Sequence, residues 1–290
     1  MNIENKIDQI PEKQSALKVI VHSFFVVPFI IAIFAVLIFL VTRIMTAEPN
    51  TAQDYLEDVK IGGATKRWQG AFELSKILSN PKMVPKDDRF VTEMINTFEY
   101  AINDRDIRIR QFLAIAMGAT GDKRYVETII KALDQNDDEI IMACAFALGN
   151  LKDNRAVEYL LDLLESGDSL VRLQSVIALG KIDDSRSIMA LEKMLADIEP
   201  NVRWDAAVAL AKQKNSSGRR IILDLLDRKY LNSFSNIDKV EQVQAMMVAI
   251  NVAPLIQDSD LKASLLELRE SDSNLKIREA ARRALLNFEE

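Results

Sequence analysis

The stretch DSLVRLQSVIALGKIDD, Asp168–Asp184, has a near copy on each side of it. The chain reads DDEIIMACAFALGNLKD 31 residues earlier and EPNVRWDAAVALAKQKN 31 residues later. Aligned on itself at this shift, the sequence keeps one register from about Lys123 to Leu226. A constant period of this length indicates a stack of repeated supersecondary units, so we take the repeat as the basis of the fold.

Each period contains two segments with apolar residues at helical spacing. The second segment carries a column of small residues, followed two positions later by a second small column. These columns are Ala116, Ala147, Ala178 and Ala209, and then Gly118, Gly149, Gly180 and Ala211. A hairpin of two such helices cannot bury its own apolar face, so the hairpins must stack. The small columns predict close approach between helix backbones.

The ends of the chain follow the repeat more loosely. RWQGAFELSK (Arg67–Lys76) and LKIREAARRAL (Leu275–Leu285) both match RWDAAVALAK of the regular part, and VEQVQAMMVAI (Val240–Ile250) resembles one more second helix in an altered register. This predicts about seven hairpins over residues 52–290, with atypical units at the ends that cap the stack. The expected class is all-α.

The repeated pattern D-x-x-V-R-x-x-x-x-x-A-L-G-x-x-x-D resembles the HEAT-repeat superfamily, in particular the short HEAT-like repeats of the phycobilisome-lyase type. The pattern is carried by Asp168–Asp184 and less perfectly by Asp106–Asp122. The resemblance covers about four fifths of the chain. It implies a right-handed, armadillo-like α-solenoid, and it implies little about function because one fold serves many functions.

A run of 24 uncharged residues, VIVHSFFVVPFIIAIFAVLIFLVT, lies between Lys18 and Arg43. As a helix it would be about 36 Å long, enough to cross a bilayer. A cleaved signal peptide has a shorter apolar region and small residues before the cut, whereas a cut after Ala47 would place Met45 at the third position before it. We therefore expect a polar tail at 1–17, an uncleaved transmembrane anchor at 18–45, a linker at 46–51 and the repeat domain at 52–290.

Orientation is predicted from the basic residues that flank the span. Lys6, Lys13 and Lys18 precede it, whereas Arg43 is the one basic residue that follows it before Lys60. This small asymmetry favours a cytoplasmic N-terminus and a repeat domain on the periplasmic or other extracytoplasmic side.

An arginine follows the β-branched position in most units, and an aspartate precedes that arginine by six or four residues. In HEAT-like families such residues typically form a ladder between adjacent repeats. The resemblance therefore implies a structural ladder built from Arg110, Arg172, Arg203, Arg278, Asp104, Asp168, Asp197 and Asp272. The alternative is that the arginines bind an acidic ligand.

Columns that change character from unit to unit are the candidates for a partner surface, since packing does not fix them. They share one face of the second helices, which line the concave side of a solenoid. The candidates are Gln69, Lys76, Phe112, Gln174, Lys181, Asp205 and Lys212. Three lysines in one row suit an acidic or amidated partner segment, although a lysine near a helix C-terminus also offsets the helix dipole. Trp68 and Trp204 share another column, and packing against a neighbouring hairpin is favoured over a binding role.

Few residues suggest catalysis. The one histidine, His22, lies at the edge of the apolar span, so a histidine-based triad, zinc site or diiron site is not expected in the repeats. Cys144 lies in a column of packed residues and is expected to be a buried, inert thiol. The sequence contains no phosphate-binding glycine loop, dinucleotide fingerprint or calcium loop. We therefore expect no catalytic residue, cofactor or metal.

These observations favour a non-enzymatic, single-pass membrane scaffold that binds partner proteins, as an accessory or assembly subunit of a transporter or respiratory complex. One alternative is a pigment-handling protein similar to the bilin lyases, for which no residue argues directly. A second is a nucleic-acid binder with HEAT-like repeats, which a net charge of −6 disfavours.

Overall fold

The computed structural model describes residues 22–46, 50–135, 137–235 and 237–288. The predicted polar tail at 1–17, the first residues of the anchor and residues 47–49 of the linker lie outside the described residues. The chain divides into two compact units, Met1–Asn50 and Thr51–Glu290. Each unit is described by itself.

The N-terminal unit contains one long apolar helix. A π-helical turn at His22–Val26 leads into α2 (Val27–Thr46). The segment Phe24–Thr42 has a mean hydropathy of 3.2, and its side chains are exposed. Its length and composition fit a membrane span, and a signal sequence has the same properties. The structure thus shows the apolar helix that the sequence predicts, while anchoring and orientation remain predictions.

The second unit consists of helices paired as hairpins, without a strand among its described residues. The first five pairs are α3 (Ala52–Ile61) with α4 (Ala64–Ile77), α5 (Asp88–Tyr100) with α6 (Ile107–Thr120), α7 (Val126–Lys131) with α8 (Asp138–Leu151), α9 (Val157–Asp162) with α10 (Ser169–Ile182), and α11 (Ile188–Met194) with α12 (Pro200–Lys212). Next, α13 (Arg219–Leu225) and the short α14 (Arg228–Asn232) precede α15 (Lys239–Ile256), and α16 (Ser259–Ser271) pairs with α17 (Leu275–Leu285). The described helices therefore form the seven hairpins expected from the repeat; their right-handed sense remains a prediction.

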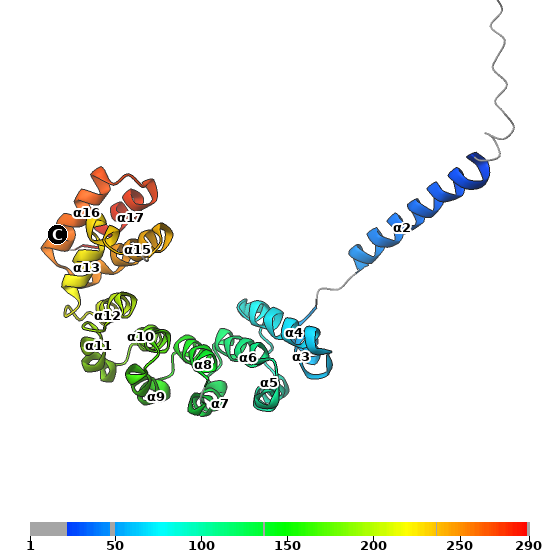
Figure 1. Cartoon of the computed structure of the whole chain (residues 1–290), viewed down its shortest axis with the longest axis horizontal. Coiled ribbons are helices and arrows are strands. Elements are labelled where there is room, and N and C mark those ends of the chain that lie inside the picture. Colours follow the sequence, from blue (N-terminus) through cyan, green and yellow to red (C-terminus); the bar gives the residue numbers. More distant parts are fainter. Residues whose placement is uncertain (1–21, 47–49, 136, 236, 289–290) are drawn as a thin grey trace, which may run out of the picture. The chain divides into compact units, whose positions relative to one another are not determined.

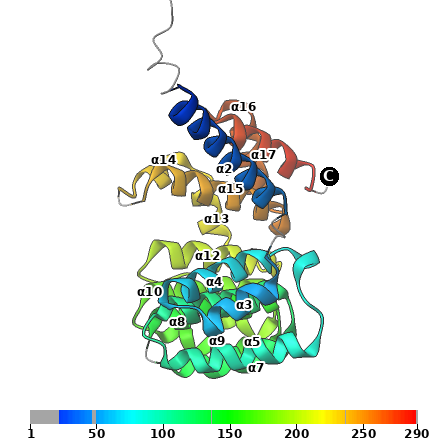
Figure 2. The ribbon, with the colours of Figure 1, turned by 90° about the vertical axis from the view of Figure 1, so that its right-hand side faces the viewer.

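The second helices of successive hairpins lie side by side. In Figure 1, α4, α6, α8, α10 and α12 form the inner row of an arc, and α5, α7, α9 and α11 form the outer row. Figure 2 looks along this stack, and α13 leads out of it toward α14 and the last helices. The columns that the sequence marked as variable lie on the inner row.

Aspartates start most of the second helices. The side chain of Asp168 accepts hydrogen bonds from the backbone N–H groups of Leu170 and Val171, and Asp137 caps α8 in the same way. Asp184 caps the 3-10 turn that precedes α11. These caps satisfy N–H groups that have no partner inside the helix. Asp137, Asp168 and Asp184 therefore act as caps at the starts of these helices and turns.

Glycine sets the spacing of the inner row. A Cβ added to Gly118 would lie 2.5 Å from the Cα of Ala147, and one added to Gly149 would lie 2.8 Å from the Cα of Ala178. Gly180 meets the Cβ of Ala209 in the same way, at 2.7 Å. Such distances leave no room for a side chain. The predicted close approach at the small columns is confirmed, with each glycine of one unit against the alanine of the next.

The regular spacing ends after α12. The inserted α14 and the loop that follows it lie between α13 and α15 in the chain, and the apolar core divides into two clusters that share α12. The indole of Trp204 packs edge-on against Phe234, 5.2 Å between ring centroids, and its Nε1–H donates to the hydroxyl of Tyr230 at 3.3 Å. Tyr230 and Phe234, which belong to the insertion, thus pack against Trp204 of α12. In the regular part of the stack, the next 31-residue unit follows at this place in the sequence.

Candidate partner-binding groove

The predicted groove residues all lie on the inner row of helices. Gln69 and Lys76 are exposed on α4, and Phe112 is partly exposed on α6. Gln174 and Lys181 on α10 and Asp205 on α12 are partly buried, while Lys212 at the end of α12 is exposed. We use the name inner groove for the partner surface that the sequence predicts from these residues, and their surroundings differ from helix to helix.

The first part of the inner groove is aromatic. Phe72 and Phe112 meet edge to face with ring centroids 5.2 Å apart. The Nζ of Lys76 lies 5.1 Å from the centre of the Phe72 ring and pairs with Glu73 at 3.0 Å. Lys76 thus has a carboxylate partner on its own helix.

The lysines farther along have different partners. Lys181 donates to the amide oxygen of Asn150 at 2.9 Å, and its Nζ lies 4.8 Å from the centre of the Phe146 ring. Burial, followed by the charges of Lys212 and Lys152, lowers the pKa of Lys181. None of these three lysines forms an ion pair with a carboxylate of the residues that the structure describes. Together they form a basic ridge at the C-terminal ends of α8, α10 and α12, defined as Lys152, Lys181 and Lys212.

Asp205 faces a small pocket at the point where the regular spacing ends. The pocket has a volume of about 280 Å³. It is lined by Leu173 of α10, Asn201, Trp204, Asp205 and Val208 of α12, Leu225 of α13, and Glu241, Gln244, Ala245 and Val248 of α15. Burial raises the pKa of Asp205 to about 6, and the charge of Lys212 opposes this shift. The Nε2 of the neighbouring groove candidate Gln174 is buried without a hydrogen-bond partner among the described residues.

The two tryptophans of the shared column have different environments. Trp204 is only 6% exposed and belongs to the core cluster of the last hairpins. Trp68 is partly exposed, and the guanidinium of Arg108 lies 4.3 Å from the centre of its ring. The packing interpretation is therefore confirmed for Trp204.

Two arginine–aspartate pairs join adjacent units in the manner expected of the ladder. Arg172 donates two hydrogen bonds to the carboxylate of Asp197, at 2.8 and 2.9 Å, and Arg67 pairs with Asp104. In each case the arginine of one unit binds the aspartate that precedes the arginine of the next unit by six residues. The lowered pKa of Asp197 is due chiefly to the hydrogen bonds from Arg172.

Arg110 occupies a rung that lacks a carboxylate. Its guanidinium donates to the side-chain oxygen of Gln135 and lies 4.8 Å from the centre of the Phe98 ring. Burial lowers the pKa of Arg110, and its Nε has no hydrogen-bond partner among the described atoms. Gln135 stands six residues before Ile141, so the glutamine replaces aspartate where the next unit has lost its arginine.

Three expected rungs differ from the prediction. Asp168 caps α10 instead of pairing with an arginine, because its carboxylate accepts from the first N–H groups of the helix. Arg203 donates to the backbone oxygens of Asp197 and Ile198, at 2.7 and 3.0 Å. Asp272 pairs with Arg228 of α14 at 2.5 Å, a partner that the insertion supplies, while Arg278 lies partly buried in α17.

A second ladder runs along the outer helices and was not predicted. Arg155 pairs with Glu127 at 2.9 Å, and Arg186 pairs with Glu158 at 3.0 Å. Each of these arginines also binds the aspartate two residues before it, the cap of its own turn. The signal was present as D-x-R in Asp122–Arg124, Asp153–Arg155 and Asp184–Arg186, at intervals of 31.

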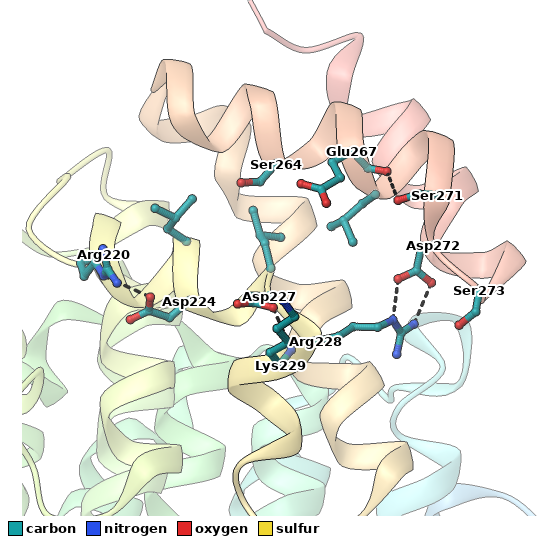
Figure 3. A pocket seen from close by; sticks show the side chains of 13 residues that line it. Arg220, Asp224, Asp227, Arg228, Lys229, Ser264, Glu267, Ser271, Asp272 and Ser273 are labelled. Carbon is teal, nitrogen blue, oxygen red and sulfur yellow. Dashed lines mark hydrogen bonds and ion pairs between the residues drawn. The ribbon is translucent and has the colours of Figure 1, made fainter.

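A larger pocket of about 680 Å³ lies between α13, α14 and α16 (Figure 3). Arg220 pairs with Asp224 at 3.1 Å on one side of it, and Arg228 binds Asp272 on the other. Two of its three basic side chains thus already have carboxylate partners. The arrangement stabilises the junction between hairpins and indicates no particular ligand.

The one cysteine is enclosed by the stack. Cys144 is fully buried, and burial raises the pKa of its thiol to about 12. This confirms the predicted burial. Within the described ranges, no three His, Cys, Asp or Glu side chains gather closely enough to hold a metal ion.

Comparison with known proteins agrees with this architecture. A family profile described as HEAT repeats matches residues 95–175 and 160–230. Within these residues the sequence is similar to HEAT repeats. The matched residues extend from the end of α5 into α14, so they include the regular part of the stack. No curated protein matches the sequence of this chain.

Among solved structures, the complex of CpcE and CpcF of phycocyanin lyase from Nostoc sp. PCC7120 is similar, with a TM-score of 0.60 and 18% identity over 84% of this chain and 90% of that chain. A designed armadillo repeat protein in complex with the peptide (KR)4 has a TM-score of 0.43 and 15% identity, over 83% of this chain and 100% of that chain. Human deoxyhypusine hydroxylase has a TM-score of 0.36 and 16% identity, over 83% and 85%. At these identities the first similarity shows the fold, an all-helical solenoid of repeats.

Proposed function

We propose that this protein is a non-enzymatic scaffold, anchored by its N-terminal apolar helix, whose inner groove binds a segment of a partner protein. The observation that carries the proposal is that different residue columns of the second helices have different surroundings. The small columns that are constant in the sequence are buried between hairpins. The variable columns carry exposed or partly exposed side chains on α4, α6, α10 and α12, which supports a role for them in recognition. A surface that packing leaves free is available for recognition.

The N-terminal apolar helix would hold this surface close to a membrane. The segment Phe24–Thr42 is long and apolar enough to hold the protein at a membrane. Anchoring raises the effective concentration of the groove near membrane partners. We therefore propose an accessory or assembly subunit of a larger membrane complex, of the transporter or respiratory kind, with the N-terminus in the cytoplasm and the repeats across the membrane.

Purification of the full chain from its native membrane in mild detergent tests the proposal. We expect at least one protein to copurify in stoichiometric amount. Charge reversal of the basic ridge by Lys181→Glu with Lys212→Glu should release that partner if its segment is acidic. Lys193→Glu is the matched control, because Lys193 is exposed on the outer helix α11. A chain that elutes alone and monomeric would contradict the subunit proposal.

A second candidate is pigment handling, which the fold similarity to the phycocyanin lyase complex favours. A protein of that kind would hold a linear tetrapyrrole in the inner groove. Adding a bilin to the purified full chain should then shift the visible absorption of the pigment. An unchanged spectrum at high protein concentration would exclude this second candidate.

A further inference from the structure

The pocket beside Asp205 exists because the repeat is interrupted. In the regular part of the stack, each second helix meets the next through small residues at close distance. At α12 the neighbour is α15, which follows the inserted α14, packs against α12 through the second core cluster, and lines the opening with Glu241 and Gln244. The interruption thus leaves an opening of about 280 Å³ on the inner row.

The lining of this opening contains two carboxylates, Asp205 and Glu241, and no basic side chain, while the charge of Lys212 acts on Asp205 from outside the lining. Neither Asp205 nor Glu241 forms a side-chain hydrogen bond or an ion pair with a residue of the described part of the chain. This differs from Asp197, which is partly buried, and from Asp272, which is buried, because both of these carboxylates bind arginines. A carboxylate withdrawn from water without a partner is costly, and an external cation would remove that cost.

We propose that this pocket binds a basic side chain, lysine or arginine, of the partner segment that occupies the inner groove; the proposal rests on the scaffold function proposed above. The walls formed by Leu173, Val208 and Val248 suit the methylene stem of such a side chain, and its charged end reaches Asp205 and Glu241. The volume is below the range of pockets for drug-sized ligands, so it suits one side chain. Two carboxylates without a third ligand do not make a metal site.

The basic ridge predicts a second feature of the partner segment, an acidic residue. Lys212 lies seven residues after Asp205 on α12, so the two charges are about 10 Å apart along the helix axis. An extended peptide advances about 3.3 Å per residue. A partner segment that places a basic residue at Asp205 can therefore place an acidic residue, about three positions away, at Lys212 and Lys181.

The probe is a six-residue acetylated and amidated peptide, Ser-Arg-Ser-Ser-Glu-Ser, added to the full chain in detergent. Its matched control has citrulline, which is neutral and nearly isosteric, in place of arginine. The protein is labelled with 5-fluorotryptophan, which gives two fluorine resonances because the chain has two tryptophans. Trp204 lines the pocket and Trp68 lies on α4, far along the row, so it serves as an internal reference.

We expect the arginine peptide to shift the Trp204 resonance in a saturable manner, with the Trp68 resonance unchanged. Replacing arginine by citrulline, or making the Asp205→Asn substitution, should weaken binding about tenfold, the usual effect of one charge-assisted hydrogen bond. A lysine peptide should bind, and Glu241→Gln should weaken binding less than Asp205→Asn because Glu241 is more exposed. Asp224→Asn, in the pocket of Figure 3, should have no effect.

Equal binding of the arginine and citrulline peptides, or equal binding by the Asp205→Asn variant, would overturn the proposal. A shift of both tryptophan resonances would also overturn it, since the peptide would then bind nonspecifically. The scaffold function is tested separately by copurification. If a partner copurifies but the arginine peptide binds no better than the citrulline peptide, only this inference is refuted. If the arginine peptide binds at the pocket but no protein copurifies, the subunit proposal is refuted.

Discussion

The regular hairpins from α6 to α12 and the last hairpins from α13 to α17 are built from similar helices but leave different surfaces. In the first region the glycines of α6, α8 and α10 each meet an alanine of the next unit, so these helices pack closely. In the second region the inserted α14 changes the spacing, and pockets open on both sides of α13. Where hairpins stack regularly, the faces between second helices are buried against each other. Where the insertion interrupts the period, part of the corresponding face remains open as a pocket.

The same comparison holds for charge. In the regular region the carboxylates near helix ends are engaged, as in the pair of Arg172 with Asp197 and in the outer ladder. Asp205 is the last residue of its column before the interruption, and it faces a pocket instead of an arginine. We infer that specificity in this protein concentrates where the repeat fails.

The largest effect is expected from Gly149→Val, which tests the close packing of the regular region. The new Cβ would lie 2.8 Å from the Cα of Ala178, and the two methyl groups have no space, so α8 and α10 must separate. We expect a loss of at least about 3 kcal/mol in the free energy of unfolding. Urea unfolding followed by circular dichroism measures it.

The matched control is Gly167→Ala. Nothing lies within 4 Å of the position that its Cβ would take, so the change should be within about 0.5 kcal/mol. Similar midpoints for the two variants would show that the small columns do not hold the regular region together.

The next effect compares two rungs of the ladder inside the regular region. Arg172→Met leaves Asp197 buried without its partner; the two side chains are 11% and 6% exposed in the pair. We expect a loss of about 2 to 3 kcal/mol at pH 7. Arg110→Met replaces a buried guanidinium that has no carboxylate partner, so it should cost less than about 1 kcal/mol.

The pH dependence identifies the cause. Arg172 lowers the pKa of Asp197 in the folded protein, so the pair stabilises the fold above the unfolded pKa of about 4 and this contribution is lost as pH falls through the folded pKa. The difference between wild type and Arg172→Met should therefore shrink below about pH 4. Equal losses for the two substitutions, or a difference that does not depend on pH, would contradict the ladder as a source of stability.

The regular region could be predicted from sequence almost completely. Packing there is local and repeats every 31 residues, so the columns at Gly149 and Ala178 determine the neighbours of each helix. The exact register of the ladder was not accessible, because an arginine reaches across to the next hairpin and the sequence does not show which aspartate it meets. Asp168 was therefore assigned to a rung although it caps α10.

The interrupted region was predicted poorly for a physical reason. The contacts of Trp204 with Tyr230 and Phe234 depend on how the insertion folds back, and no periodicity encodes that path. The same insertion decides that Asp272 meets Arg228 and that Asp205 meets a pocket. The sequence identified Asp205 as variable, but only the structure shows that its carboxylate has no partner.

The smallest effect tests the interrupted region through Asp205→Asn. Burial raises the pKa of Asp205 to about 6, so folding is penalised when this carboxyl is ionised. Lys212 opposes the shift, Glu241 of α15 faces the same pocket, and α10 and α13 contribute only Leu173 and Leu225 to its lining.

This rise in the pKa of Asp205 corresponds to at most about 2.7 kcal/mol of destabilisation, and the partial exposure of the side chain reduces it to between about 1 and 2 kcal/mol. Asp205→Asn should therefore be more stable than wild type at pH 8 by this amount. The gap should close as pH falls from about 6 toward 4, because the wild-type carboxyl then becomes protonated in the folded protein before it does so in the unfolded chain. Thermal unfolding of both proteins at pH 5 and pH 8 measures this. A variant less stable than wild type at pH 8 would mean that Asp205 has a cationic partner inside the protein, and the contrast between the closed and the interrupted region would then fail at its main residue.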